Sequence, residues 1–393
     1  EVVLRMLVLK HLYQWSFDEC EREVRGSLVY RAFCRIDCER VPDAKTLIRL
    51  AHLLDPARLK ALLDRLVAMA REQRVIRGRR LRVDTTVVET NIHYPTDSAL
   101  LADGVRILTR TMQRVRDRAK TVVLQVRDRT RSVTRRVFEI AQRSRTISRW
   151  RSAAQEKAQT RMTQLYRELL RIARAVVSDA EHVRDRTRRE MAKGTVRLRD
   201  RLRDTATAVR GVLAQPRARV IRGDTHYPDK LLSLFEPHTE AIRKGKATKP
   251  TEFGKLVKIQ EAEAQFISDY EVCPRRVPDG TLGASSIDRH RQLFGRAPRL
   301  AVADAGFALR GNEQLAYARG VQYVVLPRQR QERRCRRVRA ALRWRTGSEG
   351  RISALKRRHG LARCRYHGLA GMERWVGLGV IPNNLLVLGR AGP

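Results

Sequence analysis

The sequence lacks any apolar run of about 18 residues, the length that a helix needs to cross a bilayer, so we expect no membrane span. It also lacks a Cys-x-x-Cys pair with a matching pair of histidines. Its six cysteines are scattered, which argues against the common zinc-site patterns and predicts reduced thiols. No secretory signal pattern is present, and the first residue is Glu1 rather than Met. We therefore expect a cytoplasmic protein whose natural start lies further upstream.

Acidic residues are scarce relative to basic ones. Asp and Glu total 42 against 83 Lys and Arg, which gives a formal net charge of +41. A G+C-rich genome would explain why Arg outnumbers Lys, but it would not explain the excess of positive charge. Such an excess repels itself unless a polyanion offsets it, and nucleic acid is the polyanion that we expect. With 393 residues and 42% apolar content, the chain is long enough for two or three packed domains.

Glycine and proline are both absent between Val105 and Lys193. This stretch is rich in Arg, Ala, Leu, Val, Gln and Glu, and its apolar residues recur at steps of three and four, so it should form a set of long helices. Arg fills the other faces. A solvated helical hairpin or coiled coil fits this pattern, as does a basic arm that lies along a phosphate backbone, and the charge favours the arm.

Residues 1–78 are predicted to form a helical N-terminal domain. Ser16 and Glu19 have the spacing of an N-cap followed by an acid three residues later. The segment 41–50 has the pattern of a turn, a cap and a short helix that carries Lys45 and Arg49. It fits a DNA-reading helix-turn-helix and an ordinary helical hairpin equally well, and both interpretations stand.

The remaining segments favour a mixed sheet with flanking helices. Residues 81–89 have β-rich composition, and the chain becomes strand-rich again from about residue 217. The predicted strands are 231–235, 254–259, 264–271, 300–303 and 321–326, and the predicted helices are 287–294 and 311–318. The last strand–helix–strand succession implies a parallel pair joined by a crossover.

Three acidic residues lie where a phosphodiester-cleaving site would need them. Asp84 is predicted in the middle of its strand, Asp304 at the end of an adjacent strand, and Glu349 at the start of a basic amphipathic helix. Two magnesium ions about 4 Å apart can activate the attacking oxygen and stabilise the leaving oxygen, and Mg²⁺ prefers carboxylate ligands. The sequence therefore predicts that these three carboxylates bind two Mg²⁺ (or Mn²⁺) ions.

The predicted helix around Glu349 is strongly basic. Arg345, Glu349 and Lys356 are spaced so that they share one helical face. A carboxylate between two cations fits a site where metal and phosphate meet, and it also fits an ordinary surface ion-pair face. Nine Arg between Arg328 and Arg345 precede this helix and are expected to contact phosphates.

Five blocks of the sequence, in a fixed order, resemble the DDE transposases of bacterial insertion sequences, over nearly the whole chain. The blocks are Val3-Leu4-Arg5-Met6-Leu7-Val8-Leu9-Lys10 with Ser16-Phe17-Asp18-Glu19; Val83-Asp84-Thr85-Thr86-Val87-Val88-Glu89; Leu232-Ser233-Leu234-Phe235-Glu236-Pro237-His238-Thr239 with Arg243-Lys244-Gly245-Lys246 and Glu252-Phe253-Gly254; Ala303-Asp304-Ala305-Gly306-Phe307; and Glu349-Gly350-Arg351-Ile352-Ser353-Ala354-Leu355-Lys356-Arg357.

The resemblance implies an α/β RNase H-like core in which Asp84, Asp304 and Glu349 are the catalytic triad and the metal ligands. It divides the chain into a helical N-terminal domain (1–78), a catalytic domain (79–100 with 217–393) and a basic helical insertion (101–216). The family pattern Tyr-x2-Arg-x3-Glu-x6-Lys is matched except that Leu342 replaces the Tyr. The residues expected to contact DNA are Lys45, Arg49, Lys244, Lys246, Arg345, Arg351 and Lys356.

We therefore expect a metal-dependent transposase that binds terminal inverted repeats, cleaves to give 3′-hydroxyl ends and joins them to target DNA. It should act as a homodimer or higher assembly, because two ends must be joined. Two other hypotheses stay open. One is an inactive or truncated remnant that only binds DNA. The other is an architectural protein that compacts DNA through Arg-rich helices, which would leave the strand-borne acids without a purpose.

Overall fold

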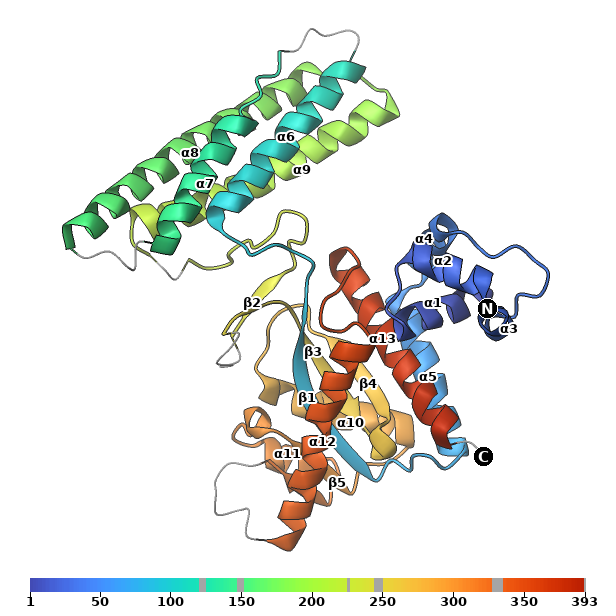
Figure 1. Cartoon of the computed structure of the whole chain (residues 1–393). Coiled ribbons are helices and arrows are strands. Elements are labelled where there is room, and N and C mark those ends of the chain that lie inside the picture. The colour runs from blue at the N-terminus through green and yellow to red at the C-terminus, as the bar shows by residue number, and fades with distance from the viewer. Residues whose placement is uncertain (120–124, 147–151, 225–226, 244–249, 327–334, 392–393) are drawn as a thin grey trace. The chain divides into compact units, whose positions relative to one another are not determined.

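The computed structural model describes the chain except residues 120–124, 147–151, 225–226, 244–249, 327–334 and 392–393 (Figure 1). The chain forms two compact units. The first joins residues 1–91 to 240–393, and the second comprises residues 92–239. The second unit extends beyond the predicted 101–216 insertion at both ends. Within the described residues, no helix has the length and the apolar content to cross a membrane.

The N-terminal part of the first unit is helical, as predicted. Its helices are α1 (Val2–Leu12), α2 (Phe17–Gly26), α3 (Leu28–Cys34), α4 (Ala44–Leu53) and α5 (Pro56–Glu72). The predicted cap of α2 is confirmed. Glu19 N donates to Ser16 Oγ at 3.0 Å, and Ser16 N donates to Glu19 Oε2 at 2.6 Å. This reciprocal pair satisfies two amide groups that the first helical turn leaves without partners, so the helix begins at a defined residue.

A mixed sheet of six strands forms the centre of the first unit. The strands are β1 (Arg80–Glu89), β2 (Glu240–Ile242), β3 (Glu252–Glu261), β4 (Ile267–Val272), β5 (Leu300–Ala303) and β6 (Tyr323–Val325). β3 runs antiparallel to β1, β2 and β4, whereas β5 is parallel to β1 and β6 is parallel to β5. The order is β2-β3-β1-β5-β6, with β4 also paired to β3. The predicted hairpin around 264–271 and the predicted parallel crossover near 300–326 are confirmed.

Alternating side chains of β1 face two different helical layers. Val83 and Val87 belong to a core cluster with Ile287 and Phe307, whereas Val88 belongs to a cluster with Trp375. The helices that contribute to these layers are α10 (Leu282–Phe294) and α11 (Asn312–Ala318) on one side, and α12 (Arg336–Arg358) and α13 (Gly368–Ala391) on the other. Short 3₁₀ turns lie at Glu263–Gln265, Asp279–Thr281 and Ala305–Phe307. Burial on both faces fixes the register, because a one-residue slip would exchange the two sets of side chains.

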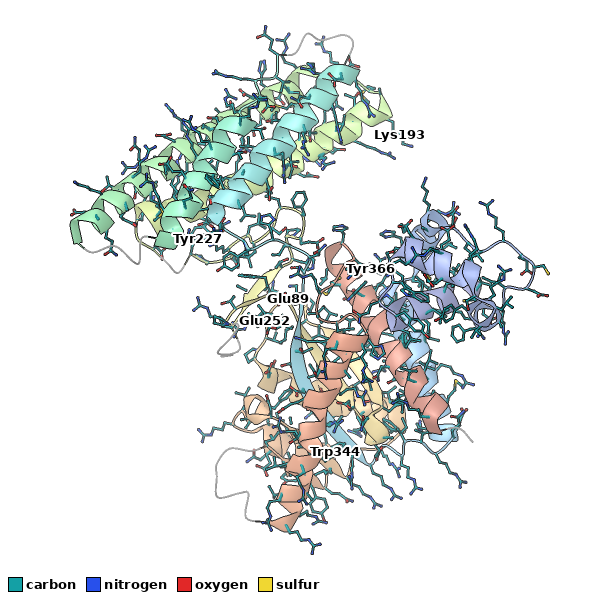
Figure 2. The ribbon with its side chains drawn as sticks, in the orientation of Figure 1. Glu89, Lys193, Tyr227, Glu252, Trp344 and Tyr366 are labelled. Carbon is teal, nitrogen blue, oxygen red and sulfur yellow. The ribbon has the colours of Figure 1, made fainter. Side chains whose placement is uncertain are left out.

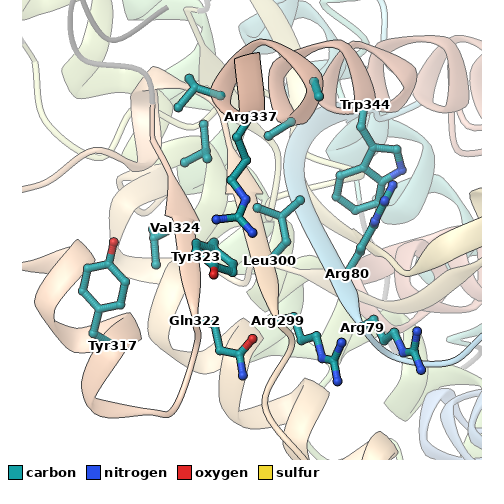
Figure 3. A pocket seen from close by; sticks show the side chains of 14 residues that line it. Arg79, Arg80, Arg299, Leu300, Tyr317, Gln322, Tyr323, Val324, Arg337 and Trp344 are labelled. Carbon is teal, nitrogen blue, oxygen red and sulfur yellow. The ribbon is translucent and has the colours of Figure 1, made fainter. Parts of the chain in front are cut away.

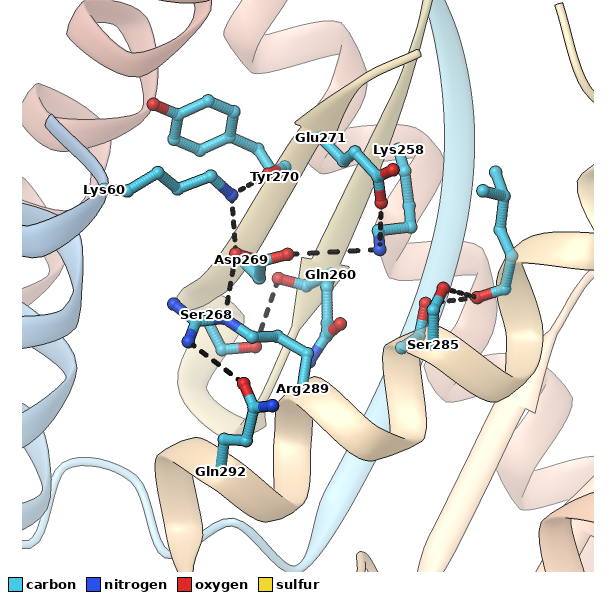
Figure 4. Close-up of polar contacts among 12 residues, drawn as sticks. Lys60, Lys258, Gln260, Ser268, Asp269, Tyr270, Glu271, Ser285, Arg289 and Gln292 are labelled. Atoms are coloured by element: carbon cyan, nitrogen blue, oxygen red, sulfur yellow. Dashed lines mark hydrogen bonds and ion pairs between the residues drawn. The ribbon is translucent and has the colours of Figure 1, made fainter. Parts of the chain in front are cut away.

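A buried polar cluster ties α5 and α10 to β4 (Figure 4). Asp269 accepts from Lys60 Nζ at 2.6 Å and lies 3.4 Å from Arg289 Nε. Lys258, almost fully buried on β3, pairs with Glu271 at 2.7 Å. Buried charges are tolerated when they are paired in this way, and the contacts hold the N-terminal helices against the sheet.

The second unit is a bundle of the long helices that the sequence predicts. They are α6 (Asp97–Arg118), α7 (Thr130–Thr146), α8 (Ser152–Arg186) and α9 (Lys193–Pro216), followed by a π-helical turn at Arg217–Ile221. Their apolar faces form one core cluster. Buried Asp97 lies 3.2 Å from Arg219 and 3.1 Å from Lys230, so it serves as an ion-pair residue of the bundle.

Two local predictions are wrong. Residues 231–235 form no strand, because Leu231 and Leu234 pack against the bundle core and the Ser233 hydroxyl accepts the amide protons of residues 235 and 236, which forms a turn. Glu349 does not begin a helix. It lies inside α12, since the Arg, Ala and Leu residues from Arg336 onward are themselves good helix formers. Part of the Arg run that was predicted to precede the helix therefore lies within it, and residues 328–334 fall outside the described residues.

Candidate active site

Asp84 and Asp304 occupy equivalent positions on neighbouring parallel strands. Val83 on β1 pairs with Ala303 on β5, and each aspartate directly follows one of these two residues. β5 ends at Ala303 whereas β1 continues to Glu89, so the two acids lie where β1 loses its parallel neighbour. Both side chains are half-buried. As the sequence predicts, Asp84 lies in the middle of β1 and Asp304 directly follows β5. The carboxyl end of a parallel strand is where α/β proteins bind ligands.

Helix α12 crosses the sheet beside β1 (Figure 1), and its residue Ser348 contacts Asp84. The Ser348 hydroxyl lies 2.9 Å from Asp84 Oδ2 and 2.8 Å from Arg345 O. A hydroxyl has one proton, so it donates to one of these acceptors at a time. The backbone of α12 at Gly347 lies close to Arg82, since a Cβ at this position would lie 2.6 Å from Arg82 Nη1.

Glu349 is exposed and is turned toward its own helix. Its side chain is 63% exposed, and Oε1 lies 3.5 Å from Arg345 Nη2. The residue of α12 that contacts Asp84 is Ser348, which directly precedes Glu349. The predicted pairing between Glu349 and Arg345 on one helical face is present. Lys356, the third residue of that face, instead lies 3.6 Å from Glu252 of β3.

Asp279 is a further acid at this edge of the sheet, and it is not among the site residues that the sequence predicts. The Thr85 hydroxyl donates to Asp279 Oδ1 at 3.0 Å. A Cβ placed on Gly306 would lie 3.1 Å from Asp304 Oδ1 and 3.2 Å from Asp279 Oδ2, so the two carboxylates flank this glycine. The only sequence signal is the Pro278-Asp279-Gly280 turn, which is more typical of a loop than of a metal ligand.

A buried ion pair lies beside Asp84 on the same face of the sheet. Arg82 Nη2 lies 2.6 Å from Glu261 Oε2, and both side chains are almost fully buried. Burial raises the pKa of the Glu261 carboxyl, whereas Arg82 and Arg351 lower it and the charge of Asp84 raises it. Arg82 also donates to Trp344 O on α12 at 2.5 Å. The pair thus links β1, β3 and α12 beneath the candidate site.

The predicted DNA contacts differ in how accessible they are. Lys45 and Arg49 are exposed on α4. Arg351 is largely buried and donates to Asn383 Oδ1 at 2.7 Å. Burial lowers the pKa of its guanidinium group. Lys244 and Lys246 lie outside the described residues. Figure 2 shows Glu252, the partner of Lys356, beside Glu89, where β1 ends and β3 begins.

The oxygen-rich donor set at this edge fits a hard divalent cation. Asp84 and Asp304 are aligned by strand pairing, and Asp279 adds a third carboxylate next to Asp304. Within the described residues, however, no three acidic, histidine or cysteine side chains are gathered as a ready metal cluster. Glu349 would have to turn from Arg345 toward Asp84 to join Asp84 and Asp304 as a metal ligand.

Comparison with known proteins gives one finding. Residues 1–53 match a family model described as "Transposase domain (DUF772)". The match covers α1 to α4, and it supports a transposase. No curated protein and no solved structure matches the chain.

Proposed function

We propose that the chain is a DDE-type DNA transposase that cleaves at terminal inverted repeats to give 3′-hydroxyl ends and joins these ends to target DNA. The observation that carries this proposal is the alignment of Asp84 and Asp304 on parallel neighbouring strands, beneath the helix that carries Glu349. The N-terminal match to a transposase domain supports the same conclusion independently. The net charge of +41 supports a DNA substrate.

The strand topology supports an RNase H-like core. An antiparallel β4-β3-β1 succession is followed by parallel β5 and β6, and helices flank the sheet. In this proposal the first acid lies within the first strand and the second follows the parallel neighbour. The third acid lies on α12, across the sheet from α10 and α11.

The cofactor in this proposal is a pair of Mg²⁺ or Mn²⁺ ions held by Asp84, Asp304 and Glu349. Such ions would lower the pKa of the attacking water or hydroxyl and stabilise the leaving oxygen. The protein itself holds the carboxylates in register and neutralises phosphates with Arg345 and Lys356. It also supports Asp84 through Ser348. Two DNA ends must be joined, so the active form is at least a dimer.

Charge-removing substitutions at the strand-borne acids test the proposal. We expect Asp84→Asn and Asp304→Asn to abolish metal-dependent nicking at the repeat boundary, because Asn cannot supply a negative ligand. Binding to the same repeat should change by less than threefold, since most of that affinity comes from phosphate contacts. Nicking by either variant at more than about a tenth of the wild-type rate would refute its proposed role.

A second function is favoured by the orientation of Glu349. The exposed carboxylate faces Arg345, and no three-acid group is assembled in the described part of the chain. An inactive remnant of a transposase, which binds repeats without cleaving them, would not need its three acids to come together. It predicts tight repeat binding with no nicking in either Mg²⁺ or Mn²⁺.

A further inference from the structure

The structure contains a cavity that the proposed chemistry does not use. It has a volume of about 590 Å³ and lies at the amino-terminal ends of β1, β5 and β6, beside the first half of α12 (Figure 3). Arg80, at its edge, is four residues before Asp84 on β1, which corresponds to about 13 Å along a strand. The cavity is therefore separate from the candidate active site.

Strand pairing builds this cavity from segments far apart in the sequence. Arg299 N donates to Arg79 O at 2.8 Å, and Tyr323 N donates to Arg299 O at 2.9 Å. These bonds place two Arg side chains and one Tyr side chain on three adjacent backbone segments. Arg337 of α12 closes over the opposite side, with its guanidinium carbon 3.7 Å from the centre of the Tyr323 ring.

The lining is strongly cationic. It includes Arg79, Arg80, Arg299 and Arg337, all of them exposed, and its described residues include no acid. Arg319 of the same unit, by contrast, is paired with Asp288 at 3.0 Å. None of the four has a carboxylate within ion-pair distance among the residues that the structure describes. This arrangement selects an anionic ligand that supplies the missing negative charge.

Aromatic rings line the same cavity. Tyr323 is 41% exposed and Tyr317 is 46% exposed. Trp344 lies at the other end of the cavity from Tyr317, next to Arg80, whose guanidinium carbon is 5.8 Å from its ring centre (Figure 3). The floor between these rings is apolar, with Leu300, Val324 and Ala341 among its residues. A flat apolar group with an attached anion fits this combination of rings, floor and cationic rim.

We propose that this cavity binds an unpaired nucleotide of a DNA strand, with its base against Tyr323 or Trp344 and its flanking phosphates on the arginine rim. Duplex DNA offers phosphates but keeps its bases stacked inside the helix, so it cannot use the rings. A single strand offers both groups. The volume is sufficient for one nucleotide rather than a longer segment. This inference rests on the proposed function only in taking DNA as the partner.

Equilibrium binding of a labelled oligodeoxythymidylate to the full chain tests the proposal. The measurement is made in EDTA, so that it does not depend on cleavage. We expect Tyr323→Ala to weaken binding about 5- to 100-fold, the loss typical of one stacked base, with the salt dependence unchanged. Tyr323→Phe keeps the ring and should bind like wild type. Tyr94→Ala, which removes an exposed Tyr of the other unit, is the matched control.

The arginine rim and the indole give separate readouts. Arg299→Ala should lower the slope of log K against log[salt] by about 0.7, the value for one phosphate on a single strand. Arg58→Ala, an exposed Arg of α5 outside the cavity, should leave the slope unchanged. The oligonucleotide should quench part of the tryptophan fluorescence, and Trp344→Phe should remove that part.

Two results would overturn the proposal. One is single-strand binding that survives Tyr323→Ala together with an unchanged salt slope in Arg299→Ala. The other is equal sensitivity of duplex binding to Tyr323→Ala, which would show that the ring supports folding or general DNA affinity. Cavity-dependent binding without any repeat cleavage would keep this inference and refute the proposed enzyme. Cleavage without cavity-dependent binding would do the reverse.

Discussion

Ser348 lies 2.9 Å from Oδ2 of Asp84, although the two residues are 264 positions apart in the sequence. The contact joins the middle of β1 to the helix that carries Glu349. The contact also places the neutral Ser348 hydroxyl against the Asp84 carboxylate. Ser348 directly precedes Glu349, the residue proposed to bind the same metal ions as Asp84. In the structure, therefore, Ser348 rather than Glu349 is the residue of α12 that holds Asp84.

Ser348→Ala should raise the Mg²⁺ concentration that cleavage requires, without abolishing cleavage. Removing a hydrogen bond that orients a metal-binding carboxylate typically costs 10- to 100-fold in metal affinity or activity. We expect the Mg²⁺ concentration for half-maximal nicking to rise about 10-fold. Thr346→Ala is the control, since the Thr346 hydroxyl bonds to Leu342 O of its own helix at 3.1 Å. Equal effects in the two variants would show that Ser348 acts only through helix stability.

Asp279→Asn tests whether the acid beside Asp304 contributes charge to the site. Asn keeps an oxygen that can accept the Thr85 hydroxyl, so the local fold should persist. We expect about a 10-fold rise in the Mg²⁺ requirement for nicking, with repeat binding unchanged. The matched control is Asp288→Asn, which removes an exposed α10 acid that pairs with Arg319. A wild-type metal requirement in Asp279→Asn would assign Asp279 to turn structure alone.

Lys10 gives a prediction for stability against pH. It is almost fully buried, with Nζ 4.6 Å from the centre of the Phe17 ring, and burial lowers its pKa from 10.5 to about 8. Between pH 8 and 10.5 the unfolded chain binds more protons than the folded one, so this residue makes stability rise with pH. Below pH 8 its charge opposes folding.

Lys10→Met should therefore increase the free energy of unfolding by about 1 to 3 kcal/mol at pH 7, after the lost contact with the aromatic rings is included. Urea denaturation at pH 7 and pH 10 measures the effect. The difference between variant and wild type should shrink at pH 10, where Lys10 of the folded wild type is neutral. A difference of the same size at both pH values would contradict the lowered pKa.

The sequence predicts the strand-borne part of the site well because that part depends on local pattern. Apolar runs that end at Asp84 and Asp304 indicate strands, and a strand–helix–strand succession indicates parallel neighbours. Strand pairing then fixes the register between the two aspartates. The helical N-terminus and the long bundle helices follow from periodicity and from the absence of helix breakers.

The remaining features depend on side-chain direction and on distant segments. Helical spacing places Glu349 beside Arg345, but it does not show that Ser348 faces the sheet. Asp279 lies in a turn, and only the fold brings it to Gly306. The arginine-lined cavity combines residues near 80, 300, 323 and 340, whose proximity no local pattern records. Residues 231–235 have the composition of a strand, yet their apolar side chains serve the bundle.

In the proposed function, Glu349 acts with Asp84 and Asp304 in metal-dependent DNA cleavage. The most direct measurement is nicking of a labelled duplex that carries the element's own terminal repeat, with and without Mg²⁺, by wild type and Glu349→Gln. Gln has nearly the same shape as Glu but lacks the charge. Repeat binding by both proteins, measured in EDTA, is the control for folding.

We expect Mg²⁺-dependent 3′ nicking at the repeat boundary by wild type. This nicking should be lost in Glu349→Gln, with repeat binding retained. Cleavage that survives in Glu349→Gln would contradict the proposed role of this residue. Tight repeat binding by wild type with no nicking in Mg²⁺ or Mn²⁺ would contradict the enzyme and favour the DNA-binding remnant.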